Sequence, residues 1–393
     1  MLKRFLPYSR QNINSNDIQS VVKVLKSDLI TQGPNINKFE KEFAKYVGAK
    51  YAVACATGTA ALHLSCLALG LNSKSSLATS SVTFVASANC AEFVGAKVHL
   101  TDIDKDTYCM CPTSLENLLK KNKIDVVVPV HLCGHSSDMK KIFKLKKKYN
   151  FKIIEDSCHA LGGKYNNYKI GSCKYSDISA FSFAPVKPIT TGEGGMITTN
   201  NKKIYEKLKI CRSHGIIKDQ TKFFNKKNAF DKKIANRWYY EVIDLGYNYR
   251  STDIQSALGL SQLKKLDEFI SKRNKIAKRY NEAFKNNKNI IIPKVKENID
   301  HAYHLYTLLI NFKRIGKTRN EIMTELFKHK VGSQVLYIPI YEQPYYNKKY
   351  KFVRKRFKHS QYYYNYALSI PVFPDLKLKE QDYIINLINK ITN

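Results

Sequence analysis

Short apolar strand candidates alternate with helical segments along the first half of the chain, and this alternation most constrains the fold. The strand candidates lie at 51–55, 97–100, 126–130 and 151–156, and a lysine-rich helix is expected over 139–149. Strands that are separated by helices usually pair in parallel, so the pattern predicts a largely parallel sheet with helices on both faces. Ligands of such sheets gather at the carboxyl ends of the strands.

Beyond residue 250 the pattern changes. The expected elements there are a long helical stretch, two strands and a closing helix, at 253–284, 303–312, 333–340 and about 379–391. A chain of 393 residues is long enough for two domains. We therefore expect a large domain at 1–250, which begins with an N-terminal arm, and a smaller α+β domain at 251–393.

The net charge of +34 arises from 66 lysine and arginine residues against 32 acidic residues. Most of the basic residues are lysines dispersed along the chain, whereas surfaces that clamp phosphates and read bases also favour arginine. The basic residues form neither a tail nor a recognisable motif. We therefore expect solvated surface and no nucleic-acid partner, although such a surface can help to collect an anionic small substrate.

The apolar runs and the cysteines restrict the location of the protein. No run approaches the roughly 18 apolar residues of a membrane span, and the N-terminal residues lack the apolar core of a signal peptide. The nine cysteines have irregular spacings and include no CxxC pair. We expect a cytoplasmic protein with reduced thiols and without a membrane partner.

Lys187 stands in unusually apolar company, between the strand candidate 178–181 and the glycine-rich turn 192–195. Its near neighbours in the sequence are Phe183, Ala184, Pro185, Val186 and Pro188. A lysine in apolar surroundings loses its proton easily, and the neutral amine can form a Schiff base. The alternative is a surface lysine in a loop, as for most lysines of this chain. The glycine-rich turn favours the first interpretation, which is typical of a pyridoxal phosphate enzyme.

Two further features follow predicted strands and suit the same cofactor. Thr57-Gly58-Thr59 stands between a strand and a helix, where free helical N–H groups and a glycine can seat a phosphate. Asp156 ends the strand 151–156 and can hold the proton on the ring nitrogen of the cofactor. Taken alone, the first feature is also an ordinary turn, and the second is also a helix cap or an ion pair. Ser182 is a further candidate for the phosphate.

Other candidate residues allow more than one interpretation. Phe84 is either part of the core or a ring that stacks on the cofactor. His159 follows the strand of Asp156 and is a candidate for a place beside the cofactor ring. His131 and His135 have the spacing of a metal pair on a helix, but Gly134 and the preceding strand argue against a helix there. We expect no metal site.

Several motifs together resemble the DegT/DnrJ/EryC1/StrS family of sugar aminotransferases, over nearly the whole chain. They lie at 31–34 (TQGP), 56–62 (ATGTAAL), 155–162 (EDSCHALG), 182–195, 212–215 (RSHG) and 246–250 (GYNYR). The resemblance implies the α/β fold type I of pyridoxal phosphate-dependent transferases, like aspartate aminotransferase. A lysine at 187 is also what separates the family's aminotransferases from its dehydratases.

The resemblance also implies roles for individual residues. Lys187 would hold the cofactor as a Schiff base and then move protons, Asp156 would pair with the ring nitrogen, and His159 would lie near the ring hydroxyl. Phe84 would stack on the ring. The implied phosphate ligands are Thr57, Gly58, Thr59, Ser182 and Asn248 of the partner subunit. The last of these implies a homodimer with shared active sites.

A narrower likeness concerns the segments 6–9, 187–191 and 334–341. They resemble a branch of the family that makes the precursor of pseudaminic acid, by moving the amino group of L-glutamate to C4 of a UDP-linked 4-keto-6-deoxy-N-acetyl-L-hexosamine. The implied substrate residues are Tyr8, Asp28, Leu29, Ile30, Thr31, Gly58, Ser182, Asn248, Arg250, Gln334, Val335, Leu336 and Tyr337. Leu336 departs from this branch, because a histidine is expected there.

Some alternatives remain open at this point. The same chemistry could act on another nucleotide-linked 4-keto sugar, such as a UDP-4-keto-GlcNAc derivative or a GDP- or dTDP-linked sugar. The chain could also be a non-catalytic basic binding protein on the same fold. Arg212 and Arg250 are both candidates to hold the carboxylates of glutamate, and Arg250 is preferred.

Overall fold

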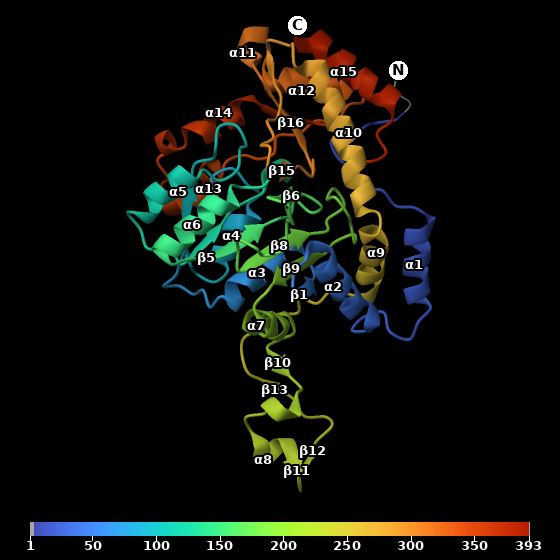
Figure 1. The fold of residues 1–393 in the computed structure, drawn as a ribbon, viewed down its shortest axis with the longest axis vertical. Coiled ribbons are helices and arrows are strands. Elements are labelled where there is room, and N and C mark those ends of the chain that lie inside the picture. Colours follow the sequence, from blue (N-terminus) through green and yellow to red (C-terminus); the bar gives the residue numbers. More distant parts are fainter. Residues whose placement is uncertain (1–3, 393) are drawn as a thin grey trace.

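The computed structural model describes residues 4–392 and is built around a seven-stranded sheet (Figure 1). The strands in spatial order are β1 (Tyr51–Cys55), β9 (Gly195–Thr199), β8 (Ile178–Ser182), β5 (Lys152–Asp156), β4 (Val126–Val128), β2 (Ser76–Ser80) and β3 (Lys97–Thr101). Only β9 runs against the other six strands. The prediction of a largely parallel sheet is thereby confirmed.

Helices cover both faces of this sheet. On one face lie α2 (Pro34–Val47), α5 (Pro112–Leu119) and α6 (Met139–Tyr149), and on the other lie α3 (Gly58–Ala68), α4 (Ala86–Glu92) and α7 (Lys202–Arg212). Strand β1 shows the alternation that this layering requires, because Ala52 and Ala54 pack into one hydrophobic cluster while Val53 packs into the other. Phe39 and Phe43 of α2 anchor the first cluster.

Helix α1 (Ser15–Leu25) packs on α9 (Asp253–Leu263) in a way that its pattern does not predict. Helical spacing suggests that Val22 and Leu25 are covered, yet both are exposed, and Val24 is buried instead. Asp17 is also buried, and its carboxylate accepts hydrogen bonds from Gln262 at 2.9 Å and from Lys265 at 2.5 Å. The ion pair between Asp17 and Lys265 therefore helps to hold α1 in place, while Val22 and Leu25 remain exposed to solvent.

A second, three-stranded sheet follows the long helix α10 (Leu266–Phe284). It consists of β14 (Ile290–Ile291), β16 (Tyr306–Ile310) and β17 (Ala367–Ile370), and its helices are α11 (Phe312–Ile315), α12 (Arg319–Lys328), α14 (Lys358–Tyr366) and α15 (Leu378–Thr392). It has a hydrophobic cluster separate from those of the large sheet. The short elements between the two sheets are β6 (Lys164–Tyr165), β7 (Tyr168–Lys169), β15 (Ile299–Asp300), η1 (Leu132–Gly134), η3 (Ile340–Glu342), α13 (Pro344–Tyr350) and η4 (Arg354–Arg356).

The strand expected at 333–340 does not form, and that prediction is wrong. One isolated bridge joins Gln334 to Ser369, and the rest of the segment crosses toward the large sheet. Its backbone groups find partners elsewhere, since the Tyr363 hydroxyl donates to the Leu336 carbonyl and the Ile340 N–H donates to the Ser81 carbonyl. In the small sheet, the strand beside β16 is instead β17, which was not expected from the sequence.

Residues 216–245 form an arm that projects far from the body of the molecule (Figure 1). The arm contains β10 (Ile216–Ile217), η2 (Gln220–Lys222), α8 (Lys226–Ala229), β11 (Phe230–Asp231), β12 (Ile234–Ala235) and β13 (Glu241–Val242). It has a small cluster of its own around Phe223. Phe224, Trp238 and Leu245 are each at least 74% exposed, which is unusual for such large apolar side chains.

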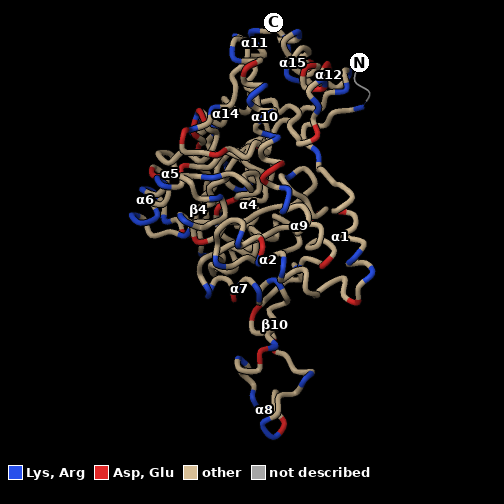
Figure 2. Tube along the Cα trace, turned by 45° about the vertical axis from the view of Figure 1, so that its right-hand side comes forward, with Lys and Arg blue, Asp and Glu red and all other residues tan. Residues whose placement is uncertain are grey.

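The surface charge is dispersed, as expected. Lysines and arginines occur along nearly every element of the trace, with acidic residues scattered among them (Figure 2). Within residues 4–392, no helix has the length and the apolar character needed to cross a membrane.

Candidate active site

Three predicted functional segments meet at one edge of the large sheet, where parallel strands end. Asp156 is the last residue of β5 and pairs with Ala180 of the adjacent strand β8, which ends at Ser182. Helix α3 begins at Gly58, next to Ser182. A Cβ atom added to Gly58 would lie 2.6 Å from the Ser182 Cβ, so only glycine allows this close approach. The sheet therefore brings Gly58, Asp156 and Ser182 together, as the sequence predicts.

The start of α3 has the properties of a phosphate site. Thr57 caps the helix, with its hydroxyl oxygen accepting a hydrogen bond from the Ala60 N–H at 3.0 Å. The N–H groups of Gly58 and Thr59 are the first of the helix and have no intrahelical acceptor. These free N–H groups lie at the N-terminus of α3, where the helix dipole favours an anion, and Ser182 lies next to Gly58. Together they form a cradle for a phosphate group. This cradle fits the phosphate of the cofactor that the sequence implies.

Asp156 is placed to hold a positively charged ring nitrogen. It is only 5% exposed, and each carboxylate oxygen accepts one hydrogen bond, at 2.6 Å from the Ser87 hydroxyl and at 3.2 Å from the Cys158 N–H. Each oxygen can accept a further hydrogen bond. A buried carboxylate with spare acceptor capacity suits a protonated pyridine ring.

Lys187 lies in the turn that follows β8, partly covered by its surroundings. The backbone N–H of Lys187 donates a hydrogen bond to the Ala184 carbonyl at 2.9 Å, and this bond closes the turn. Burial lowers the pKa of Lys187, and the neighbouring Cys158 and Asp156 offset part of this effect. The direction of this shift is the one expected for a lysine in apolar surroundings. A neutral lysine amine is the form that attacks a carbonyl carbon.

His159 and two aromatic rings stand on the same side of the sheet edge. The His159 Nε2 atom lies 3.1 Å from the Tyr337 hydroxyl, and the ring centroids of Tyr337 and Phe84 are 5.7 Å apart. Burial, followed by the charge of Lys187, holds the pKa of His159 well below its usual range. Phe84 is 53% exposed, so the alternative that it belongs to the core is wrong. An exposed ring at this place is available for stacking.

The comparisons with known proteins agree with this geometry. Residues 11–389 match the model of the DegT/DnrJ/EryC1/StrS aminotransferase family. This chain belongs to that family. It is a sugar-nucleotide aminotransferase, and its cofactor is pyridoxal phosphate.

Relatives of this aminotransferase carry two different substrate names. The UDP-4-amino-4,6-dideoxy-N-acetyl-beta-L-altrosamine transaminase of Campylobacter jejuni is 37% identical over 392 residues, which cover 98% of each chain. The GDP-perosamine synthase of Escherichia coli O157:H7 is 32% identical over 390 residues, also 98% of each chain.

Solved structures of similar aminotransferases cover nearly the whole chain. Helicobacter pylori PseC, described as an aminotransferase of pseudaminic acid biosynthesis, superimposes with a TM-score of 0.89 at 31% identity, over 99% of each chain. Spr1654 of Streptococcus pneumoniae, in its pyridoxamine phosphate form, superimposes with a TM-score of 0.87 at 27% identity, over 98% of this chain and 99% of that one. The aminotransferase fold expected from the sequence is therefore confirmed.

The structure gathers some of the expected substrate residues. Tyr8, Leu336 and Tyr337 share one small cluster with Val82 and Cys133, next to His159. Within the same segment, Gln334 is exposed and Val335 is partly buried. Leu336, where a histidine is expected, packs into this cluster as an apolar side chain. The N-terminal arm and the segment 334–337 thus meet, although they are far apart in the sequence.

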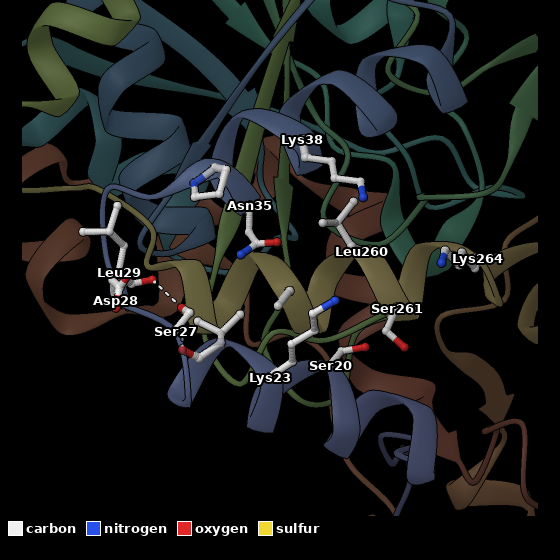
Figure 3. A pocket seen from close by; sticks show the side chains of 13 residues that line it. Ser20, Lys23, Ser27, Asp28, Leu29, Asn35, Lys38, Leu260, Ser261 and Lys264 are labelled. Carbon is white, nitrogen blue, oxygen red and sulfur yellow. Dashed lines mark hydrogen bonds between the residues drawn. The ribbon is translucent and has the colours of Figure 1, made fainter.

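Residues 28–31 lie away from these residues. Asp28 and Leu29 line a hollow of about 590 Å³ between α1, α2 and α9, together with Lys23, Lys38 and Lys264 (Figure 3). None of the residues gathered around Lys187 lines this hollow. Ile30 and Thr31 are exposed beside it. The structure of the single chain therefore does not bring this segment to the other substrate candidates.

Asn248 and Arg250 follow the projecting arm (residues 216–245), where the chain returns to the body of the molecule. Asn248 is exposed and forms a backbone bridge with Ser213. Arg212 is already engaged, since its Nη1 atom donates to Glu40 at 2.5 Å and to the Ala54 carbonyl at 2.7 Å. This arrangement favours Arg250 over Arg212 as the free guanidinium for a carboxylate.

The histidines with metal-like spacing have other partners. His131 Nε2 lies 2.7 Å from Glu155, and His135 Nδ1 lies 2.7 Å from the Ser136 carbonyl. Among residues 4–392, no group of three or more potential ligands could hold a metal ion.

Sequence reasoning missed two residues that support the site. Ser87 hydrogen-bonds Asp156, and His304 packs its ring against His159 with 4.3 Å between centroids. The only signal for His304 was a polar residue at the edge of an apolar strand candidate. Ser87 gave no signal, since a serine in a small-residue helix is common.

Proposed function

We propose that this aminotransferase moves the amino group of L-glutamate to C4 of a UDP-linked 4-keto-6-deoxy-N-acetylhexosamine, as in pseudaminic acid biosynthesis. The product would be UDP-4-amino-4,6-dideoxy-N-acetyl-beta-L-altrosamine. The placement of Lys187 beside Asp156 at the strand ends carries the chemistry. The full-length likeness to the Campylobacter jejuni transaminase and to PseC supports the substrate.

Each residue at the strand ends has a proposed task. Bound pyridoxal phosphate supplies an electron-withdrawing ring and a carrier for the amino group. In the first half of the reaction the Lys187 amine would take the proton from the donor's α-carbon and deliver it to the C4′ carbon of the cofactor, and in the second half it would move a proton from that carbon to C4 of the sugar. Asp156 stabilises the positive charge on the ring nitrogen, while Gly58, Thr59 and Ser182 hold the phosphate. Phe84 covers one face of the ring.

We also propose a homodimer in which Asn248 of the partner subunit completes the phosphate site. The large exposed side chains of the arm support this proposal, because Phe224, Trp238 and Leu245 gain from being covered. Residues 28–31 would likewise serve a site that includes the second subunit, since they lie apart from Tyr337 within one subunit.

Two more general proposals concern the whole chain. The division into domains at residue 250 is supported by the separate hydrophobic cluster of the second sheet. A cytoplasmic location is supported by the nine cysteines, all of which are free thiols.

The covalent attachment of the cofactor to Lys187 provides the test. We expect purified protein to be yellow, and borohydride reduction followed by peptide mass analysis to find the cofactor on Lys187. Lys187→Ala should lose amination by more than about a thousandfold, because it removes the proton-transfer group. The exposed lysine Lys174→Ala serves as the control and should retain full activity. A Lys187→Ala variant that still aminated the keto sugar would overturn the proposal.

Two observations support a second substrate class. The GDP-perosamine synthase is also related over the full length, and Leu336 departs from the first branch. A panel of UDP-, GDP- and dTDP-linked 4-keto sugars, each incubated with the enzyme and L-glutamate, distinguishes the two. Preferred amination of a GDP-linked sugar would replace the first assignment and leave the chemistry at Lys187 unchanged.

A further inference from the structure

The two ring nitrogens of His159 have different partners, and this difference fixes its proton. The backbone N–H of Cys133 donates to His159 Nδ1 at 3.3 Å. A nitrogen that accepts a hydrogen bond carries no proton, so a neutral His159 must be protonated at Nε2. The Nε2 atom lies 3.1 Å from the Tyr337 hydroxyl. His159 therefore donates to Tyr337, and the reverse direction is excluded.

The turn that presents the Cys133 N–H is unusual. Cys133 has a φ of 59°, in the left-handed region that few non-glycine residues adopt. The next residue, Gly134, packs so tightly that an added Cβ atom would lie 2.8 Å from the Tyr303 nitrogen. On the other side the His304 ring lies 4.3 Å from the His159 ring. Backbone geometry and packing thus hold the imidazole in one orientation.

The consequence appears at Tyr337. Its oxygen accepts the hydrogen of His159, so its own hydroxyl hydrogen must point elsewhere. Within residues 4–392 the Tyr337 hydroxyl has no second hydrogen-bond partner. Its ring stands beside the half-exposed Phe84, and its own burial raises the pKa of Tyr337, so the hydroxyl stays protonated. A protonated hydroxyl with a fixed acceptor role toward His159 is a hydrogen-bond donor toward the site.

We propose that Tyr337 donates its hydroxyl hydrogen to an oxygen of the bound keto sugar, and that His159 is the positioning residue that sets this direction. This inference rests on the proposed function for its ligand. It adds to His159 a role distinct from contact with the cofactor ring. It also links the turn at Cys133 to substrate selection, because the site then favours an acceptor oxygen at this position.

The first experiment measures the tautomer without any cofactor. In apo protein labelled with ¹⁵N-histidine, we expect the His159 signal to show protonation at Nε2 at pH 7.5. His159→Gln identifies that signal by its loss among the ten histidines. A signal from the Nδ1-protonated form or from the doubly protonated ring would overturn the proposal.

The second experiment separates positioning from a structural role. Tyr337→Phe should raise the KM for the keto sugar about tenfold, with little change in the KM for L-glutamate. His159→Leu should have a similar effect, whereas His159→Gln should restore near-normal KM. A glutamine can accept from the Cys133 N–H through its oxygen and donate to Tyr337 through its nitrogen.

A double-mutant cycle tests the coupling. In the Tyr337→Phe background, His159→Leu should add little to the KM of the keto sugar. The control is Tyr363→Phe, which removes the hydroxyl that supports Leu336 at 2.7 Å, and it should show no coupling to His159. Full additivity of His159→Leu and Tyr337→Phe would overturn the inference. Failure of the proposed function is distinguishable, because it would appear as absent cofactor absorbance in wild-type protein while the tautomer measurement still stands.

Discussion

Asp156 concentrates the electrostatics of the site in one side chain. It ends a buried strand, where a carboxylate without partners would be costly. The Ser87 hydroxyl and the Cys158 N–H compensate part of this cost, and each carboxylate oxygen can accept a further hydrogen bond. Its value to the enzyme therefore lies in charge, while its shape is nearly that of asparagine.

An asparagine at position 156 would keep nearly the same side-chain shape and remove the charge. Asp156→Asn should reduce turnover about 10²- to 10³-fold, because a neutral amide cannot stabilise the protonated ring nitrogen. Steady-state kinetics with saturating keto sugar and L-glutamate measure the loss. Ser87→Ala is the matched control, since it removes one hydrogen bond and keeps the charge, and it should cost no more than a few fold. Equal losses in both variants would assign Asp156 a structural role.

Functional residues were predictable from the sequence where they stand among unusual neighbours. Lys187 stood out because its neighbours in the sequence are apolar, and in the folded protein burial lowers its pKa. His304 could not be found, since its contact with His159 joins residues 145 positions apart and leaves no local pattern. Phe84 was undecidable from sequence, because an aromatic ring is equally suited to a core and to a ligand site.

In the turn from β1 into α3, the packing against β8 restricts position 58 to glycine. Gly58 lies against Ser182 of β8, and an added Cβ atom would be 2.6 Å from the serine Cβ. Neither atom belongs to a flexible side-chain end, so the backbone of the helix or the strand would have to shift. That shift would move the N–H groups proposed for the phosphate.

We therefore predict that Gly58→Ala destabilises the protein by about 1–3 kcal/mol and weakens cofactor binding. The double variant Gly58→Ala/Ser182→Gly removes the clashing Cβ and should regain most of the stability. Urea unfolding of the apo protein measures this, and absorbance titration measures cofactor affinity. If the double variant were no more stable than Gly58→Ala alone, the contact with Ser182 would not be the cause.

Elements with local signals were predictable, and those set by distant partners were not. The helix 139–149 was predictable because its sequence pattern is local, and α6 has the same bounds. The segment 333–340 has strand-like composition, but Ser81 and Tyr363 bind its backbone outside any ladder. The projecting arm has no predictable pattern, because several of its large apolar side chains, such as Phe224, Trp238 and Leu245, are exposed and give no periodic signal.

At the scale of the molecule, four of the buried histidines make folding sensitive to acid. Burial lowers the pKa of His135 to about 4 and lowers the pKa values of His159, His301 and His304. In the unfolded chain a histidine titrates near pH 6.5. Between these values the unfolded state binds more protons than the folded state, so stability must fall as the pH falls below about 6.5.

We predict a loss of about 1 kcal/mol of unfolding free energy for each of these four histidines between pH 7.5 and 5.5. Urea titrations of the apo protein at the two pH values measure it, in a range above the titration of most carboxylates. His135→Gln should flatten the dependence by about one such increment. An unfolding free energy that is equal at both pH values would contradict the burial of these rings.

The position of β1 in the large sheet has a consequence for synthesis. Its residues Tyr51–Cys55 pair with Gly195–Thr199, so its partner strand follows 144 residues later in the chain. At translation rates of roughly 5–20 residues per second, β1 must wait about 7–29 s on the ribosome before it can pair. During that interval the segment that leads into the phosphate cradle is an unpaired apolar strand. Chaperone capture of the nascent chain should therefore concentrate on intermediates that have not yet released residue 199.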